Sequence, residues 1–308
     1  MIAYIFPGQG SQFAGMGKEL AAASPAAANV LEAIDGALGF CLSGIMFGED
    51  PGALLPTDIQ QPAVFAHSVA ALAAVWERHE AGPAMVAGHS LGEYSALVAA
   101  GCMSVADAAR LVRTRGELMA RAAEETGGAM AAVVSMEREA VEAAVRDAAD
   151  AGVVVIANYN CPGQIVISGE ADAVARARDL VKERGGRAIP LKVSGAFHSP
   201  LMAPAAEALR PTVLAADLHD AQVPLVSNVD ATPRQDALEI KQALIAQVTG
   251  AVRWEESIRR MIAEGVTTFL ELGPGTVLSK MIPRIDDGVA AFSAGTVAQA
   301  EAALAAIG

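Results

Sequence analysis

Short apolar runs alternate along the chain with longer stretches in which apolar residues recur at helical spacing. The runs at Ile2–Phe6, Met85–Gly88 and 268–272 predict short buried strands. Each run leads into a glycine-containing turn and then into a predicted helix. Units of this strand–turn–helix kind are typical of an α/β domain.

The same patterns predict further elements. A long helix is predicted over residues 61–79, with Pro62 tolerated in its first turn. The other predictions are helices over residues 16–23, 92–100, 104–124, 240–247 and 254–264, and a strand over residues 223–227.

The middle of the chain has shorter elements in quick succession. The predicted elements are a strand at 129–135, a helix at 137–149, strands at 153–158 and 164–168 around a turn at 160–163, a helix at 171–184 and a strand at 187–193. This β-α-β-β-α-β order is the ferredoxin-like arrangement. We therefore expect residues 125–195 to form a ferredoxin-like small subdomain, inserted into a large domain of residues 1–124 and 196–308.

Composition and charge exclude several classes of protein. Apolar residues make up 53% of the 308 positions and charged residues 19%, which is enough apolar material for a sizeable core. A net charge of −13 argues against nucleic acid and anionic membrane surfaces as partners. No apolar run reaches the roughly 18–20 residues of a membrane span, and the N-terminus has no signal-peptide pattern. We expect a cytoplasmic protein.

The three cysteines, Cys41, Cys102 and Cys161, stand far apart and next to apolar residues or turn signals. No pair has the spacing of metal ligands or of a disulfide framework. We therefore expect buried structural thiols, and neither a metal nor a redox cofactor.

The strongest chemical signal is Gly88-His89-Ser90-Leu91-Gly92, a G-x-S-x-G pattern between a predicted strand and a predicted helix. The turn is so tight that its flanking residues must be small, a demand that the two glycines meet. Ser90 would stand exposed at the end of the strand, and the backbone N–H of Leu91 could point at a developing oxyanion. An ordinary glycine-bracketed turn is the alternative. The flanking elements favour a nucleophile in an α/β-hydrolase-like large domain.

A serine hydroxyl needs an adjacent base, and the chain has five histidines. His198 stands in an irregular loop directly after the predicted small subdomain, and catalytic side chains concentrate on loops at domain junctions. A histidine that serves only its own loop is the alternative. The others are expected in packing, on the surface or pointing away from Ser90: His67, His79, His89 and His219.

Three arginines, Arg110, Arg113 and Arg115, lie on the predicted helix 104–124, and most arginines in such a cluster are solvated. Arg115 differs because Gly116 follows it, which permits close approach of another backbone. An arginine near the serine could bind a substrate carboxylate through two parallel hydrogen bonds.

Several stretches together resemble the malonyl-CoA:acyl carrier protein transacylase family of bacterial type II fatty acid synthesis. They occur in the family's order and cover nearly the whole chain, so the set is far more specific than a lone GHSLG. The stretches are 6–12 (FPGQGSQ), 61–63 (QPA), 88–96 (GHSLGEYSA), Arg115-Gly116 with Met119, 158–160 (NYN), 162–164 (PGQ), 195–202 (GAFHSPLM), 252–254 (VRW) and 271–275 (ELGPG).

The resemblance implies a role for each matching position. Ser90 would be acylated, with His198 as its general base and later its acid. Gln247 would orient His198 through its backbone carbonyl, in place of the acid of a hydrolase triad. The remaining implied roles are Gln9 and Leu91 as oxyanion-hole amides, Arg115 as the anchor of the malonyl carboxylate, and Asn158 and Asn160 beside the thioester arm or coenzyme.

The reaction that the resemblance implies is a ping-pong transfer. Ser90 would attack the malonyl thioester, coenzyme A would leave, and the phosphopantetheine thiol of holo-acyl carrier protein would take the malonyl group. The expected partners are malonyl-CoA and holo-acyl carrier protein. No bound cofactor, nucleic acid or membrane is expected, and the chain is expected to be a monomer.

Three other functions stay open. A trans-acting acyltransferase of polyketide synthesis would share the fold, the Ser–His pair and Arg115, and would differ in its carriers. A serine thioesterase or esterase would show a Ser–Asp–His order with a late histidine, whereas the last histidine here is His219. A non-catalytic carrier-binding protein is disfavoured by the intact set of Ser90, His198 and Arg115.

Overall fold

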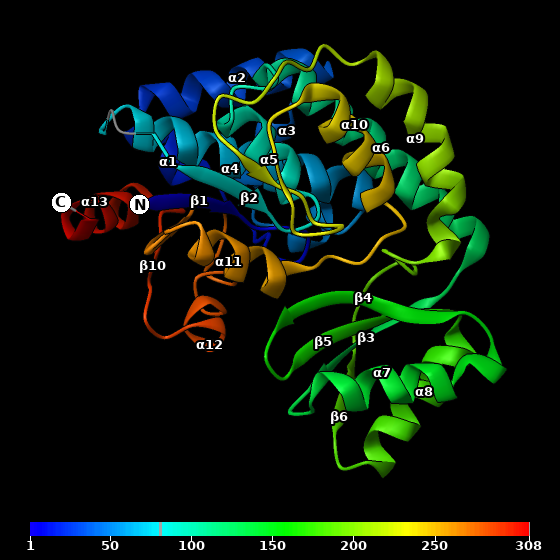
Figure 1. The fold of residues 1–308 in the computed structure, drawn as a ribbon. Helices are drawn as coiled ribbons and strands as arrows, with labels where there is room; N and C mark the ends of the chain where they lie inside the picture. Colours follow the sequence, from blue (N-terminus) through cyan, green and yellow to red (C-terminus); the bar gives the residue numbers. More distant parts are fainter. Residues whose placement is uncertain (80–81, 308) are drawn as a thin grey trace.

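The computed structural model describes residues 1–79 and 82–307, which form two sheets in separate parts of the molecule (Figure 1). The larger sheet has six strands, in the order β10 (Ala290–Ser293), β9 (Thr268–Glu271), β1 (Ile2–Phe6), β2 (Met85–Gly88), β7 (Leu225–Val226) and β8 (Pro233–Arg234). The smaller sheet has four, in the order β4 (Val154–Cys161), β5 (Gln164–Gly169), β3 (Ala129–Val134) and β6 (Arg187–Pro190). The mixed α/β class expected from the sequence is confirmed.

The larger sheet is parallel from β10 to β7, and only β8 pairs antiparallel. Alternate residues of its strand β1 point to opposite faces: Tyr4 and Phe6 join one apolar core, and Ala3 and Ile5 join the other. A strand buried on both faces carries a continuous apolar run, which is why β1 and β2 can be located from sequence alone.

Helices cover both faces of the larger sheet (Figure 1). One face is covered by α2 (Pro25–Leu38), α4 (Thr57–Trp76), α5 (Gly92–Ala99), α6 (Val105–Thr126), α9 (Ala203–Ala215) and α10 (Ala237–Gln247). The other is covered by α11 (Trp254–Ala263) and α12 (Ile282–Ile285). Shorter or peripheral helices are α1 (Lys18–Ala23), α3 (Leu42–Phe47), α13 (Val297–Ile307), η1 (Pro51–Leu54), η2 (Ala149–Ala151) and η3 (Pro200–Met202). Within the described ranges, no helix combines the length and the apolar character needed to cross a membrane.

The long helix α4 begins at Thr57, four residues before the predicted start, so Pro62 lies inside the helix and not in its first turn. A proline cannot donate to the carbonyl four residues earlier, which here is that of Asp58. Arg113 of α6 supplies the missing donor, because its Nη1 donates to the Asp58 carbonyl oxygen at 2.5 Å. The predicted start of this helix at residue 61 was wrong, because the donor that compensates for Pro62 lies on another helix and leaves no mark in the local sequence.

The smaller sheet is antiparallel, and α7 (Arg138–Asp147) and α8 (Ala171–Glu183) cover one of its faces with a separate apolar cluster. The chain order of its elements, β3-α7-β4-β5-α8-β6, is the predicted one. On the opposite face, Met130, Ala157 and Val166 join the core of the larger part. Backbone bonds add to this contact: Val252 N donates to Ala157 O (2.8 Å), and Tyr159 N donates to Val252 O (2.9 Å).

Several predicted boundaries differ from those observed. Strand β4 continues to Cys161, which pairs with Gln164, so the turn is shorter than predicted. Strand β6 ends at Pro190, and the predicted strand 223–227 shrinks to the two residues of β7. The predicted turn at 273–275 starts no helix, because Glu271 accepts the backbone N–H groups of Leu278 and Ser279 (3.0 and 2.8 Å) and holds this segment as turns until α12 begins.

Candidate active site

Ser90 lies at the turn between β2 and α5, where the backbone must reverse direction sharply. Its φ of 52° is in the left-handed region, which costs a non-glycine residue on the order of 1–3 kcal/mol. A Cβ on Gly88 would lie 1.9 Å from the carbonyl of Gly92, and a Cβ on Gly92 would lie 2.1 Å from the carbonyl oxygen of Phe6. Only glycine fits at both flanking positions, as the sequence predicted.

Two amide side chains hold Ser90 in this conformation. The N–H of Ser90 donates to Oδ1 of Asn228 (2.7 Å), whose Nδ2 donates to the carbonyl of Gly88 (2.7 Å). The carbonyl of Ser90 accepts from Nε2 of Gln247 (2.8 Å). Asn228 lies between β7 and β8 and Gln247 ends α10, so the strained residue depends on two distant parts of the chain.

The Ser90 hydroxyl and the His198 ring form a hydrogen bond, with 2.7 Å between Oγ and Nε2. The other ring nitrogen, Nδ1, lies 3.0 Å from the carbonyl oxygen of Gln247 and 3.1 Å from that of Gly250. Two carbonyl acceptors require a proton on Nδ1, so Nε2 is the basic nitrogen that faces the hydroxyl. Backbone carbonyls thus stand behind the histidine, where many serine hydrolases use an acid.

The surroundings of His198 keep its ring neutral. Burial lowers the pKa of the ring to about 3, and the positive charge of Arg115 acts in the same direction, while the two carbonyl contacts oppose the shift. A general base must be unprotonated to accept a proton. His198 is therefore in its basic form at neutral pH.

Arg115 lies on α6 with 1% of its surface exposed. Its Nη1 donates to Oε1 of Gln61 (2.7 Å), and its Nη2 donates to Oε1 of Gln247 (2.9 Å) and to Oγ of Ser90 (3.2 Å). Burial lowers the pKa of the guanidinium, yet arginine keeps its charge in proteins. A fixed positive charge therefore lies beside the serine hydroxyl.

The close approach predicted for Gly116 is present in the structure. A Cβ on Gly116 would lie 3.0 Å from the Cα of Asp58 and 3.1 Å from the carbonyl oxygen of Thr57, both on α4. A larger residue would push α6 away from α4. The glycine therefore lets Arg115 reach Gln61, which is also on α4.

Three buried residues of the site, Gln61, Glu93 and Asn228, are assigned no role by the sequence. Oε2 of Glu93 accepts from Nε2 of Gln247 (2.7 Å) and from the backbone N–H of Asn228 (3.4 Å). Burial raises the pKa of Glu93 to about 7, against the effect of these hydrogen bonds and of the Arg115 charge. Gln61 and Glu93 lie in the stretches 61–63 and 88–96 that resemble the family, so the sequence offered a signal for them as site residues. Asn228 lies outside these stretches, and no such signal marks it.

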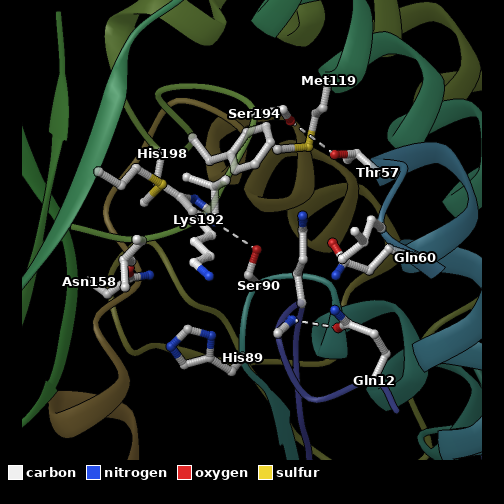
Figure 2. A pocket seen from close by; sticks show the side chains of 17 residues that line it. Gln12, Thr57, Gln60, His89, Ser90, Met119, Asn158, Lys192, Ser194 and His198 are labelled. Atoms are coloured by element: carbon white, nitrogen blue, oxygen red, sulfur yellow. Dashed lines mark hydrogen bonds between the residues drawn. The ribbon is translucent and has the colours of Figure 1, made fainter. Parts of the chain in front are cut away.

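A cavity of about 360 Å³ opens above Ser90, between the loops of the larger sheet and the smaller sheet (Figure 2). His198 and Met119 line it from the larger part, and Asn158 lines it from β4. A second cavity of about 280 Å³ shares part of this lining, including Gln9 and Asn158. The two cavities together could hold an extended substrate that ends at the serine.

The backbone N–H groups of Gln9 and Leu91 have no hydrogen-bond partner in the part of the chain that the structure describes. Gly8 lets the loop after β1 pack against the serine turn, since a Cβ there would lie 2.5 Å from the carbonyl oxygen of His89. Two unpaired backbone N–H groups on neighbouring loops beside a serine could donate to an oxyanion, which is the function of an oxyanion hole. Their role in a reaction stays a prediction.

Asn158 and Asn160 both lie on β4, at the edge of the cavities. Oδ1 of Asn160 is 2.9 Å from Nε2 of His89, so His89 turns towards this strand and not towards Ser90. The His89 ring also contacts Trp254, with 5.6 Å between ring centroids. Asn158 lines both cavities, and Asn160 lines the second one. A role for either asparagine with the coenzyme is a prediction.

Two of the other histidines have partners elsewhere. Nε2 of the buried His67 is 2.8 Å from the carbonyl oxygen of Gly295, and the exposed His219 lies 3.6 Å from Asp217. Across residues 1–79 and 82–307, no group of three or more histidine, cysteine or acidic side chains could hold a metal ion. All three thiols were expected to be buried, and this is wrong for Cys41. Its side chain is exposed at the start of the short helix α3, whereas Cys102 and Cys161 are buried.

Comparison with known proteins assigns the family. The model of the acyl transferase domain family matches residues 3–298. A malonyl CoA-acyl carrier protein transacylase of Bacillus subtilis strain 168 is 50% identical over 287 residues, 92% of this chain and 90% of the relative. The solved acyl-carrier-protein-S-malonyltransferase of Bartonella henselae is 44% identical with a TM-score of 0.95, covering 99% of each chain. A malonyl-transacylase solved in complex with a type II polyketide synthase acyl carrier protein is 39% identical with a TM-score of 0.94, also over 99% of each chain. The chain belongs to the malonyl-CoA:acyl carrier protein transacylase family of acyl transferases.

Proposed function

We propose that this protein transfers malonyl groups from malonyl-CoA to the phosphopantetheine thiol of holo-acyl carrier protein, through a malonyl-Ser90 intermediate. The observation that carries the proposal is the buried Arg115 guanidinium, 3.2 Å from the serine hydroxyl oxygen. A neutral acyl group gives no reason to bury a cation there, whereas a malonyl group brings a carboxylate that pairs with it. The names of the relatives support the same substrate.

The first half-reaction forms the acyl-enzyme. Ser90 Oγ attacks the thioester carbonyl while its proton moves to Nε2 of His198. The carbon–sulfur bond then breaks, and coenzyme A leaves as the thiol with the proton from His198. The amides of Gln9 and Leu91 donate to the oxyanion that forms between these steps. The Gln247 carbonyl keeps Nδ1 protonated throughout, so the proton transfers use Nε2 alone.

The second half-reaction reverses these steps with another thiol. The carrier's phosphopantetheine sulfur attacks the malonyl ester while His198 takes the thiol proton. The bond between the acyl carbon and Ser90 Oγ then breaks, and the serine recovers its proton from His198. Acyl and proton transfers suffice for both steps, so we propose no metal and no redox cofactor. Arg115 binds the malonyl carboxylate in both halves and keeps the ester carbonyl in one orientation.

The cavities suggest where the rest of the substrate lies. The pantetheine arm carries amide groups, and the amide side chains of Asn158 and Asn160 line the second cavity. We propose that these asparagines bind that arm, which coenzyme A and the carrier protein share. The same space would then serve both half-reactions, as a ping-pong mechanism on one site requires.

Finer features of the fold belong to the same proposal. We propose an α/β-hydrolase-like large domain of residues 1–124 and 196–308, with a ferredoxin-like insertion at residues 125–195. The strand order β4-β5-β3-β6, with both helices on one face, supports the second description. The monomeric state and the cytoplasmic location stay predictions from the sequence.

A carrier of polyketide synthesis is the second candidate partner. The relative solved with such a carrier supports it, because its fold covers 99% of this chain. The hydrolase alternative has less support, since the groups that contact Nδ1 of His198 within residues 1–79 and 82–307 are two backbone carbonyls and not an acid.

The test of the proposed function is the intact mass of the protein after brief incubation with malonyl-CoA or acetyl-CoA. We expect a malonyl adduct that forms faster than an acetyl adduct. Holo-acyl carrier protein should discharge it much faster than water does, and carriers from fatty acid and polyketide synthesis compared side by side would identify the pathway. An adduct lost equally fast without a carrier would contradict the transferase and favour a hydrolase.

Replacing Arg115 by alanine should change the acyl preference. Loss of a charge-assisted pair with the malonyl carboxylate should slow malonyl transfer about 10- to 100-fold, while transfer of neutral acetyl groups should change less. The measurement is kcat/KM for malonyl-CoA and acetyl-CoA. Arg110→Ala is the matched control, because Arg110 is on the same helix but exposed and paired with Asp107. An unchanged malonyl-to-acetyl ratio in Arg115→Ala would show that the carboxylate is bound elsewhere.

A further inference from the structure

A buried carboxylate lies directly beneath the serine turn, and the reaction steps above do not use it. Glu93 is in the first turn of α5 and is 1% exposed. Its Oε2 accepts from the Gln247 side chain and from the backbone of Asn228, at 2.7 and 3.4 Å. These two residues are the ones that hold the N–H and the carbonyl of Ser90. Glu93 therefore contacts both supports of the strained nucleophile.

Gln247 links this carboxylate to Ser90, His198 and Arg115. Its backbone carbonyl accepts from Nδ1 of His198, and its side-chain Oε1 accepts from Arg115. Its Nε2 donates both to the carbonyl of Ser90 and to Glu93. A shift or rotation of this one side chain would disturb the nucleophile and the guanidinium together.

The chemistry of a carboxylate explains why an acid stands at position 93. A glutamine amide has a donor end and an acceptor end that differ little in shape, and it can rotate by half a turn. An ionised carboxylate can only accept, so it requires Nε2 of Gln247 to face Glu93. Oε1 then faces Arg115, which can only donate. Glu93 and Arg115 together select one orientation of the amide, and that orientation is the one that binds the Ser90 carbonyl.

We infer that Glu93 is a positioning residue for acyl transfer, which fixes the Gln247 amide and thereby the geometry of Ser90, His198 and Arg115. Glu93 touches neither substrate nor reacting atoms and acts through its two hydrogen-bond partners. The inference deepens the proposed function and rests on it for the identity of the acyl group, but not for the competence of the Ser90–His198 pair.

The test compares Glu93→Gln with Glu271→Gln. Glu271 is a matched control, because it is also fully buried and also accepts backbone N–H groups, which in the described part of the chain come from Leu278 and Ser279 and not from the supports of Ser90. An alkyl fluorophosphonate is the probe, since it reports the reactivity of the serine–histidine pair whatever the natural acyl group is. In that reaction Ser90 Oγ bonds to phosphorus, fluoride leaves and the serine proton passes to His198. The assay is run about one to two units above the Glu93 pKa of about 7, where the wild-type carboxylate is ionised.

Glu93→Gln should label about 10-fold more slowly than the wild type, the change expected when a charge-assisted hydrogen bond becomes a neutral one. Glu271→Gln should label at the wild-type rate. With malonyl-CoA, kcat of Glu93→Gln should fall in parallel, and KM should rise, because the Arg115 guanidinium that binds the malonyl carboxylate loses part of its fixed position.

Wild-type labelling by Glu93→Gln would overturn the inference, and so would equal slowing in Glu271→Gln, which would indicate a general cost of losing a buried acid. Slow labelling by Glu93→Gln in a protein that takes no malonyl group would keep the inference and remove the proposed substrate.

Discussion

Ser90→Ala should form no adduct with malonyl-CoA and should lose transfer activity by about 10,000-fold or more, down to the assay background. The reason is that the proposed intermediate is an ester of this hydroxyl, which among the described residues is the one hydrogen-bonded to Nε2 of His198. Alanine has the same Cβ, so it makes the same backbone demand at a φ of 52° and should leave the fold intact. Intact-protein mass and transfer kinetics are the measurements, with the melting temperature as a check on folding.

Ser95→Ala is the matched control for this experiment. Ser95 is fully buried on α5, close in sequence to the nucleophile, and its hydroxyl has no hydrogen-bond partner in the described residues. We expect normal adduct formation in that variant. A malonyl adduct on folded Ser90→Ala would place the acylation site elsewhere and disprove the covalent mechanism proposed for this serine.

His198→Asn should lower kcat/KM for malonyl transfer about 100- to 10,000-fold, the usual contribution of a general base. Asparagine suits the position because His198 has a φ of 57°, a left-handed conformation that asparagine tolerates better than most residues. The exposed His219, changed to asparagine, is the control. Retained activity in His198→Asn would mean that another group takes the serine proton.

The protonation of His198 gives an independent check on the same site. Burial and the Arg115 charge hold its pKa at about 3, so lowering the pH through the usual histidine value of about 6.5 should leave the ring neutral. NMR of the ring signals during a pH titration measures this directly. A transition of the His198 ring near 6.5 would show that the site is more hydrated or less positive than the structure indicates.

The elements in which apolar and polar positions differ clearly were predicted well, whereas helices in which they hardly differ were missed. Strands β1 and β2 are short apolar runs buried on both faces, and the charged residues of α6, apart from the buried Arg115, lie on its outer side. The helices α2, α9 and α13 are rich in alanine, so an apolar stripe hardly stands out, and none of them was predicted. Strand β8 has two residues and β10 four, too few for a period-2 pattern to be evident.

The site was predicted in two ways that depend on different information. The serine turn follows from adjacent residues, because the space at Gly88 and Gly92 excludes any side chain. The role suggested for Gln247 came from the family resemblance, whereas Arg115 was singled out by the glycine beside it and then given its role by the resemblance. Glu93 and Asn228 were assigned no role, since nothing local marks a buried carboxylate or a turn asparagine as a support for a residue far away in the chain.

The sequence by itself determined strands β1, β2 and β9 of the larger sheet, the serine turn, and the element order of the small sheet. These features depend on apolar periodicity and on small residues at neighbouring positions, which are readable without knowing the fold. Only the tertiary structure decided which side chains meet at Ser90. His198 is 108 residues away, Asn228 is 138 and Gln247 is 157. Their convergence depends on how the sheet layers and the inserted segment pack, and hydrogen bonds across such separations leave no trace in local spacing.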